Sequence, residues 1–168
     1  MTILYLARHG ETVDNVNQIM QGQVQGRLTE RGILQACQLR DHLASVPFDA
    51  VVSSDLKRAV DTALIVAEPR GLEVVMTPLL RERDWGSFTG RFIPDLKHET
   101  WPDDVESLPA LQARAQQFLE YVKCEYADKQ VLAVGHGIIN KAIQAVLYRK
   151  QMSEIERMSN CEVRRLAL

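Results

Sequence analysis

The chain opens on the stretch Ile3-Leu4-Tyr5-Leu6-Ala7-Arg8-His9-Gly10-Glu11-Thr12, an apolar run that stops abruptly at charged and polar residues. The short run without polar alternation predicts a buried β-strand. Arg8 can bind an oxyanion through its planar guanidinium, and His9 can act as a nucleophile, a base or a ligand. Gly10 lets the backbone approach a ligand closely. Because open α/β sheets bind ligands beyond the carboxyl ends of their strands, a functional site is expected here.

The composition is that of an ordinary soluble globular protein. The 168 residues are enough for one domain, 46% are hydrophobic and 25% are charged. A net charge of −2 gives no reason to expect nucleic acid or an anionic membrane as a partner. The three cysteines are scattered, which argues against a zinc site or disulfide scaffold and for a reducing compartment. With no apolar run long enough to span a membrane and no signal peptide, a cytoplasmic location is expected.

Apolar periodicity alternates between strand and helix along the chain. Further strands are expected at 49–54, 72–76, 131–134 and 161–168, after a loop at 13–27 that contains a helical turn. Helices are expected from the N-cap Thr29 to about Leu43, over 55–68, from the N-cap Ser107 to about 127, and over 138–148. The inward helical faces are expected to include Ile33, Leu64 and Leu108, and Ser153 is expected to cap a short helix. The alternation predicts one α/β domain spanning 1–168, with a mostly parallel central sheet and helices on both faces.

The 85–106 segment is irregular, with interleaved glycines, prolines and aromatic residues. It is too long for a tight connection, so we predict a short lid or functional loop. Aromatic side chains that merely cover the edge of the core are the alternative, and both interpretations can hold together.

Residues suited to phosphate chemistry follow four apolar regions: Arg8-His9-Gly10, then Ser53 to Arg58, then Glu82, then Gly135-His136-Gly137. Parallel strands bring their carboxyl ends to one edge of the sheet, so these residues can converge. Two arginines and helix N-termini would bind the phosphate oxygens, one imidazole would attack phosphorus, and a carboxylic acid would protonate the leaving oxygen. Guanidinium and imidazolium charge make a metal or other cofactor unnecessary, and the chain lacks a Walker-type loop.

Each of these residues also has a purely structural interpretation. His136 between two glycines fits a packed histidine in a tight turn. Arg58 fits an ion pair with Asp55 or Asp61, and Glu82 fits an exposed charge. Coincidence at all four positions is the weaker explanation.

The motifs resemble those of the histidine phosphatase superfamily, in its branch of phosphoglycerate mutase-like phosphatases. They occur in the family's order through most of the chain: Arg8-His9-Gly10-Glu11-Thr12 with Asn15; Gln21-Gly22; Leu28-Thr29 with Gly32, Gln35 and Ala36; Ser53 to Ala59 with Thr62-Ala63; Leu80 with Glu82; Gly86; Gly135-His136-Gly137; and Asn160.

The resemblance implies a role for each matching residue. His9 would become a transient phosphohistidine, and Arg8, Arg58 and His136 would complete the phosphate pocket. Glu82 would be the general acid and then the base for the hydrolytic water. The resemblance also assigns the substrate-binding positions Asn15, Gln21, Gly22 and Gly137, and no metal.

The expected activity is metal-independent hydrolysis of a small phosphorylated metabolite, for example α-ribazole phosphate or a sugar phosphate. The span from Glu82 to His136 lacks the longer basic insertion of the family's mutases, which favours hydrolysis. A phosphoglycerate mutase, a protein phosphohistidine phosphatase and a non-catalytic phosphate-binding module remain as alternatives. A homodimer is compatible with the sequence, and Arg83, Arg91 and Lys97 are candidates to contact a second anionic group or to remain solvated.

Overall fold

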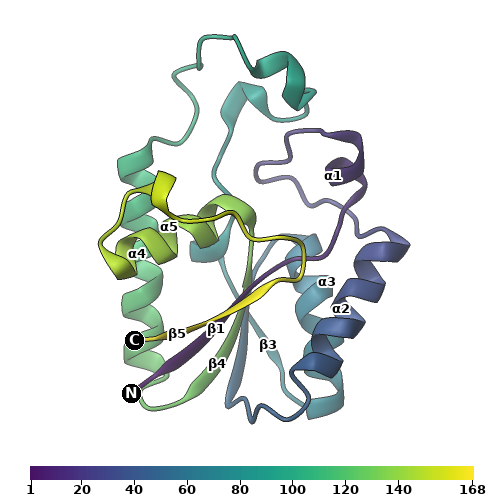
Figure 1. Cartoon of the computed structure of the whole chain (residues 1–168), viewed down its shortest axis with the longest axis vertical. Helices are drawn as coiled ribbons and strands as arrows, with labels where there is room; N and C mark the ends of the chain where they lie inside the picture. Colours follow the sequence, from purple (N-terminus) through teal and green to yellow (C-terminus); the bar gives the residue numbers. More distant parts are fainter.

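A computed structural model describes all residues, 1–168, as an α/β domain built on a five-stranded sheet (Figure 1). The strands lie in the order β3-β2-β4-β1-β5. Their bounds are β1 Ile3–Arg8, β2 Ala50–Ser54, β3 Val74–Thr77, β4 Gln130–Gly135 and β5 Val163–Ala167. The first four strands are parallel, and β5 runs antiparallel to β1. The expected mostly parallel sheet is therefore confirmed.

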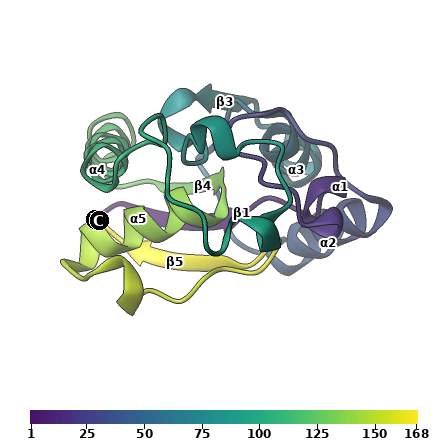
Figure 2. The ribbon, with the colours of Figure 1, turned by 90° about the horizontal axis from the view of Figure 1, so that it is seen from above.

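Helices cover both faces of this sheet, as the sequence predicts. α2 (Glu30–His42) and α3 (Lys57–Ala67) lie on one face, and α4 (Leu108–Glu125) and α5 (Gly137–Tyr148) lie on the other (Figure 2). Each face encloses its own group of buried apolar side chains, one under α4 and α5 and one under α2 and α3. The short α1 (Val13–Asn17) is the helical turn expected within the 13–27 loop.

Two of the expected N-caps, Thr29 and Ser107, are confirmed, because each side-chain oxygen accepts a hydrogen bond from a backbone amide in the first turn of its helix. Thr29 Oγ1 accepts from Gly32 N at 3.0 Å, and Ser107 Oγ accepts from Ala110 N at 3.2 Å. Ser153 does not cap a helix: it lies inside a 3₁₀ turn, η5 (Met152–Glu154), which Gln151 caps.

Three residues expected on inward faces are exposed instead. Ile33, Leu64 and Leu108 are 46%, 50% and 39% accessible to solvent. Ile33 and Leu64 lie along an open groove between α2 and α3, because these helices turn other residues inward. On α3 the inward face carries Arg58 and Thr62 beside its alanines and Val66, so polar residues take places that a purely apolar count gives to leucine.

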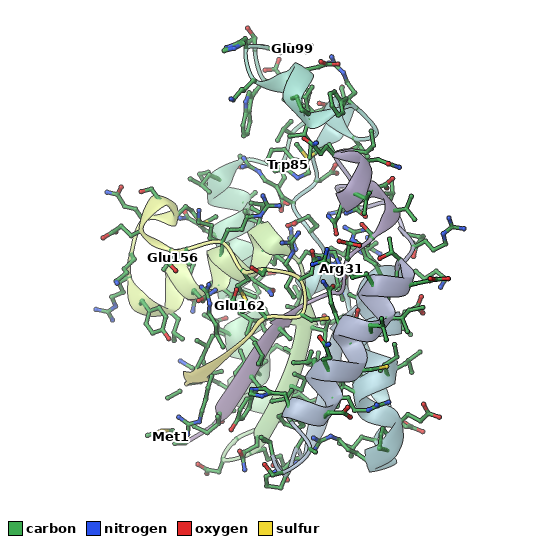
Figure 3. The ribbon with its side chains drawn as sticks, turned by 45° about the vertical axis from the view of Figure 1, so that its right-hand side comes forward. Met1, Arg31, Trp85, Glu99, Glu156 and Glu162 are labelled. Atoms are coloured by element: carbon green, nitrogen blue, oxygen red, sulfur yellow. The ribbon has the colours of Figure 1, made fainter.

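The 85–106 segment extends beyond the carboxyl-terminal edge of the sheet, with Trp85 near its base and Glu99 near its tip (Figure 3). It contains two short 3₁₀ helices, η3 (Gly86–Phe88) and η4 (Ile93–Leu96). Backbone hydrogen bonds attach it to the loop after α1: Met20 N donates to Arg91 O at 2.9 Å, and Gly90 N donates to Met20 O at 2.7 Å. Its position suits a lid, a role that stays a prediction.

Candidate active site

Two histidines lie side by side where β1 and β4 end. The parallel register pairs Arg8 with Gly135, and His9 N donates to Gly135 O at 3.1 Å. The ring centroids of His9 and His136 are consequently only 5.1 Å apart. Both imidazoles are buried, at 2% and 0% exposure.

The His9 ring is oriented by its own backbone neighbour. Its Nδ1 lies 2.7 Å from Gly10 O, an acceptor that fixes the proton on Nδ1. The lone pair of the neutral ring is then on Nε2, the nitrogen available for attack on an electrophile. Burial first, and then the charges of Arg58 and Arg8, lower the pKa of His9 well below 6.5, which keeps the imidazole neutral.

His136 is oriented by a serine from the neighbouring strand. Its Nε2 lies 2.8 Å from Ser54 Oγ, and the same oxygen accepts from Leu56 N at 3.2 Å. The other ring nitrogen, Nδ1, is buried without a hydrogen-bond partner in the protein. Burial, followed by the Arg58 charge, lowers the pKa of His136 well below 6.5. The interpretation of His136 as an ordinary packed histidine leaves that Nδ1 unexplained, because buried polar atoms are normally paired.

Arg58 is not paired with a carboxylate of its own helix. Asp55 pairs with Arg81 and Asp61 pairs with Lys57, so the expected ion-pair alternative is wrong. Arg58 is 1% exposed and donates to the carbonyl oxygens of the 22–25 loop, including Gly22 O at 2.8 Å. Burial lowers its pKa to about 10, so it remains a cation at neutral pH.

Arg8 is the second buried guanidinium, 7% exposed, and its Nη1 donates to Met158 O at 2.8 Å. The Nε atoms of Arg8 and Arg58 are buried without a partner in the protein, like Nδ1 of His136. Three nitrogens from β1, α3 and the β4–α5 turn thus share this property. Such a set of unpaired nitrogens suits an oxyanion ligand.

Glu82 caps the N-terminus of α5. Its Oε2 accepts from Ile138 N at 3.1 Å, and its Oε1 accepts from Ile139 N at 3.0 Å and Arg83 N at 2.8 Å. The expectation of a freely exposed charge is therefore wrong. A carboxylate takes two of the amides at this helix terminus, and the expectation that the terminus also binds phosphate, through Gly137, stays a prediction.

The remaining predicted residues border the same region. Asn15 Oδ1 accepts from Thr12 N, and Gln21 Oε1 accepts from Thr12 Oγ1, so hydrogen bonds orient both amides. Gly22 has φ +53°, and its carbonyl holds Arg58. A Cβ on Gly137 would lie 3.5 Å from Arg8 Nε, in contact with that guanidinium.

A cavity of about 180 Å³ collects these groups. Thirteen residues line it: Arg8, His9, Asn15, Ile19, Met20, Gln21, Gly22, Arg58, Glu82, Trp85, Ile93, Ile138 and Arg157. Seven are predicted site residues, while His136 and Gly137 adjoin the cavity without lining it.

Sequence reasoning missed Arg157 and the apolar wall residues. Arg157 follows no strand, so nothing in the pattern of strand ends marks it. Asn160, which belongs to the family motifs, joins two segments of the site: its Nδ2 donates to His9 O at 3.1 Å and to Asn15 Oδ1 at 3.3 Å.

No three His, Cys, Asp or Glu side chains are grouped so as to hold a metal ion. None of the helices is both long and apolar enough to cross a membrane.

The fold and this site define a phosphatase of the histidine type, and comparisons with known proteins agree. The model of the histidine phosphatase superfamily (branch 1) matches residues 4–168. This chain belongs to that superfamily. It is an enzyme of the phosphatase class, with a histidine as nucleophile.

Curated relatives carry more than one activity in their names. The chain is 34% identical over 182 residues to "Probable phosphoglycerate mutase GpmB" of Proteus mirabilis, covering 99% of this chain and 85% of the relative. It is 33% identical over 159 residues to the adenosylcobalamin/alpha-ribazole phosphatase of Salmonella typhimurium, covering 86% and 79%.

Among solved structures, YhfR of Bacillus stearothermophilus superposes with a TM-score of 0.94. The identity is 28%, and the alignment covers 100% of this chain and 92% of the other. The likeness extends over the whole α/β domain.

Proposed function

We propose that this protein hydrolyses small phosphorylated metabolites without a metal ion, through a phosphohistidine on His9. The observation that carries the proposal is the set of three buried nitrogens without partners beside the His9 imidazole: Nε of Arg8, Nε of Arg58 and Nδ1 of His136. Each can donate to a phosphoryl oxygen, and two of them belong to cations.

In the first half-reaction, the Nε2 lone pair of His9 forms a bond to phosphorus as the ester P–O bond breaks. Glu82 gives its proton to the departing alkoxide oxygen. The hydrogen bond from Nδ1–H to Gly10 O stabilises the positive charge that the imidazole gains.

In the second half-reaction, Glu82 removes a proton from water, and the water oxygen bonds to phosphorus. The N–P bond then breaks, which returns neutral His9 and releases inorganic phosphate. The low pKa of His9 favours this return to the neutral ring.

A panel of phosphomonoesters, assayed in a chelator and without added metal, tests the proposal. We expect release of inorganic phosphate from at least one small ester, at a rate that changes less than about twofold on adding Mg²⁺. The reason is that cationic side chains, and not a metal ion, stabilise the negative charge of the transition state. Phosphate release that requires a divalent metal, or substrate binding without any release, would contradict it.

A mutase is the second candidate, because the Proteus mirabilis relative carries that name. It predicts that phosphate moves between positions of a phosphoglycerate in the presence of a bisphosphate primer. Product analysis by NMR separates the two activities, since a hydrolase yields only inorganic phosphate and glycerate.

A further inference from the structure

Arg157 is an exposed cation at the cavity for which the proposed mechanism has no use. It lines the cavity with Arg8 and Arg58. It forms no ion pair or hydrogen bond, whereas most arginines near the site are engaged.

Its place follows from the segment that joins α5 to β5, which runs on the β5 side of the sheet (yellow in Figures 1 and 2) and contacts the carboxyl-terminal end of β1. Met158 O in this segment accepts from Arg8 Nη1, and Cys161 N donates to Arg8 O at 3.0 Å. These contacts anchor the backbone that directly follows Arg157. The backbone from which the Arg157 side chain extends is therefore held beside the phosphate-binding groups.

The guanidinium groups of Arg8 and Arg157 lie close together beside Gly137. A Cβ on Gly137 would lie 3.5 Å from Arg8 Nε and 3.8 Å from Arg157 Nε. Burial, and next the Arg157 charge, lower the pKa of Arg8. Placing two cations together costs free energy, which an anion bound between or beside them would offset.

The sequence analysis named three candidates to contact a second anionic group: Arg83, Arg91 and Lys97. Two of them are engaged elsewhere and the third does not line the cavity. Arg91 is paired bidentately with Glu99, at 2.6 and 2.5 Å. Arg83 donates to Glu106 O and lies over the rings of Trp85 and Trp101. Lys97 is exposed and does not line the cavity.

Resting on the proposed function, we propose that Arg157 determines specificity by binding a second anionic group of the substrate, close to its phosphate. One phosphate uses Arg8 and Arg58, which leaves Arg157 for a carboxylate or a second phosphate. The small cavity limits the separation of the two anions to a few bonds. The preferred substrate is then a compact phosphorylated acid or bisphosphate rather than a neutral sugar or alcohol phosphate.

Kinetics on a matched pair of esters test this proposal. 3-Phosphoglycerate carries a carboxylate where glycerol 3-phosphate carries a neutral hydroxymethyl group. 2,3-Bisphosphoglycerate tests a second phosphate as the additional anionic group. We expect kcat/KM for 3-phosphoglycerate or for 2,3-bisphosphoglycerate to exceed that for glycerol 3-phosphate. In Arg157→Met, the ratio of these two kcat/KM values should fall about tenfold, mainly through a higher KM for the ester with the second anionic group. Arg157→Lys should retain part of the ratio.

Arg165→Met is the matched control, because Arg165 is also exposed but does not line the cavity, and it should retain the wild-type ratio. A ratio that is unchanged in Arg157→Met, or a wild type that prefers glycerol 3-phosphate, would overturn the assignment.

A binding measurement separates this proposal from the proposed function. p-Nitrophenyl phosphate turnover by the wild type reports on hydrolysis alone. If it is absent, calorimetric titration of His9→Ala with the same three esters still decides the role of Arg157. A preference for the anionic esters that Arg157→Met removes supports the role, and equal affinities reject it.

Discussion

The Glu82 carboxylate accepts hydrogen bonds from three backbone amides, those of Arg83, Ile138 and Ile139. Such bonds fix its orientation toward the cavity wall at the start of α5. Replacement by glutamine keeps the shape and hydrogen-bonding capacity of one oxygen but removes the transferable proton.

We therefore expect Glu82→Gln to slow hydrolysis of alkyl phosphates about 100-fold or more, since their leaving alkoxides need a proton. p-Nitrophenyl phosphate, whose leaving group is stable as an anion, should slow far less. Single-turnover rates on both ester types measure the difference, and equal slowing would exclude Glu82 as the proton donor.

The two buried histidines couple stability to pH. Burial is the largest cause that lowers the pKa of each below 6.5, so the unfolded chain binds more protons than the folded one between those lowered values and 6.5. Stability thus rises with pH in that window and is lost as pH falls below about 6.5, by at most about 1.4 kcal/mol per pH unit for each histidine.

Urea unfolding at pH 7.0 and 5.5 in phosphate-free buffer checks this linkage. His9→Asn should reduce the pH dependence of the unfolding free energy relative to the wild type, because one titrating site is removed. An identical pH dependence in the two proteins would contradict the buried, neutral state of His9.

Individual site residues were predictable to different degrees. Arg8 ends an unmistakable apolar strand and His9 directly follows it, and the motif order identified Arg58, Glu82 and His136. The pattern did not reveal that Glu82 takes the α5 amides, because that contact joins residues 56 and 57 positions apart. Arg157 was missed, since an arginine in an irregular segment has no local signal.

At the scale of elements, the loop after β1 packs against the first turn of α2 with no space for a side chain. A Cβ on Gly32 would lie 2.1 Å from Glu11 O, and one on Gly10 would lie 2.6 Å from Gly32 O. Thr29 N also donates to Glu11 O, at 3.0 Å. This contact positions the residues that directly follow His9.

Gly32→Ala should therefore push the loop away from α2, at a cost of about 1–3 kcal/mol in unfolding free energy, and lower kcat. Gly71→Asn is a suitable control, because Gly71 has no neighbour near its Cβ position and its left-handed backbone is one that asparagine tolerates. Chemical unfolding and steady-state kinetics of both variants provide the comparison. Equal stability of the two would show that the close approach is unimportant.

The elements themselves were largely predictable, because apolar periodicity and capping residues act locally. Thr29 and Ser107 are N-caps as expected. Ile33, Leu64 and Leu108 were misplaced, because periodicity within one helix does not show which of its apolar residues the neighbouring elements cover.

At the scale of the whole molecule, the strand order β3-β2-β4-β1-β5 makes one site from distant segments. β4 lies between β1 and β2, so the turn that carries His136 comes next to both His9 and Ser54. Strand–helix alternation predicted a parallel sheet, but it does not determine the order of strands within the sheet. The position of the α5–β5 segment beside the site, where Arg157 lines the cavity, depends on that order and was equally inaccessible from the sequence.

The central claim is that this assembly makes His9 a nucleophile toward phosphorus, and rapid quenching tests it most directly. The enzyme is mixed with a ³²P-labelled ester that it hydrolyses, denatured within milliseconds, and examined for protein-bound phosphate. We predict phosphate on His9 that is stable in base and lost in acid, formed and consumed at rates compatible with turnover, and absent from His9→Ala. His9→Ala with full turnover, or turnover with no phosphate ever bound to His9, would contradict the account.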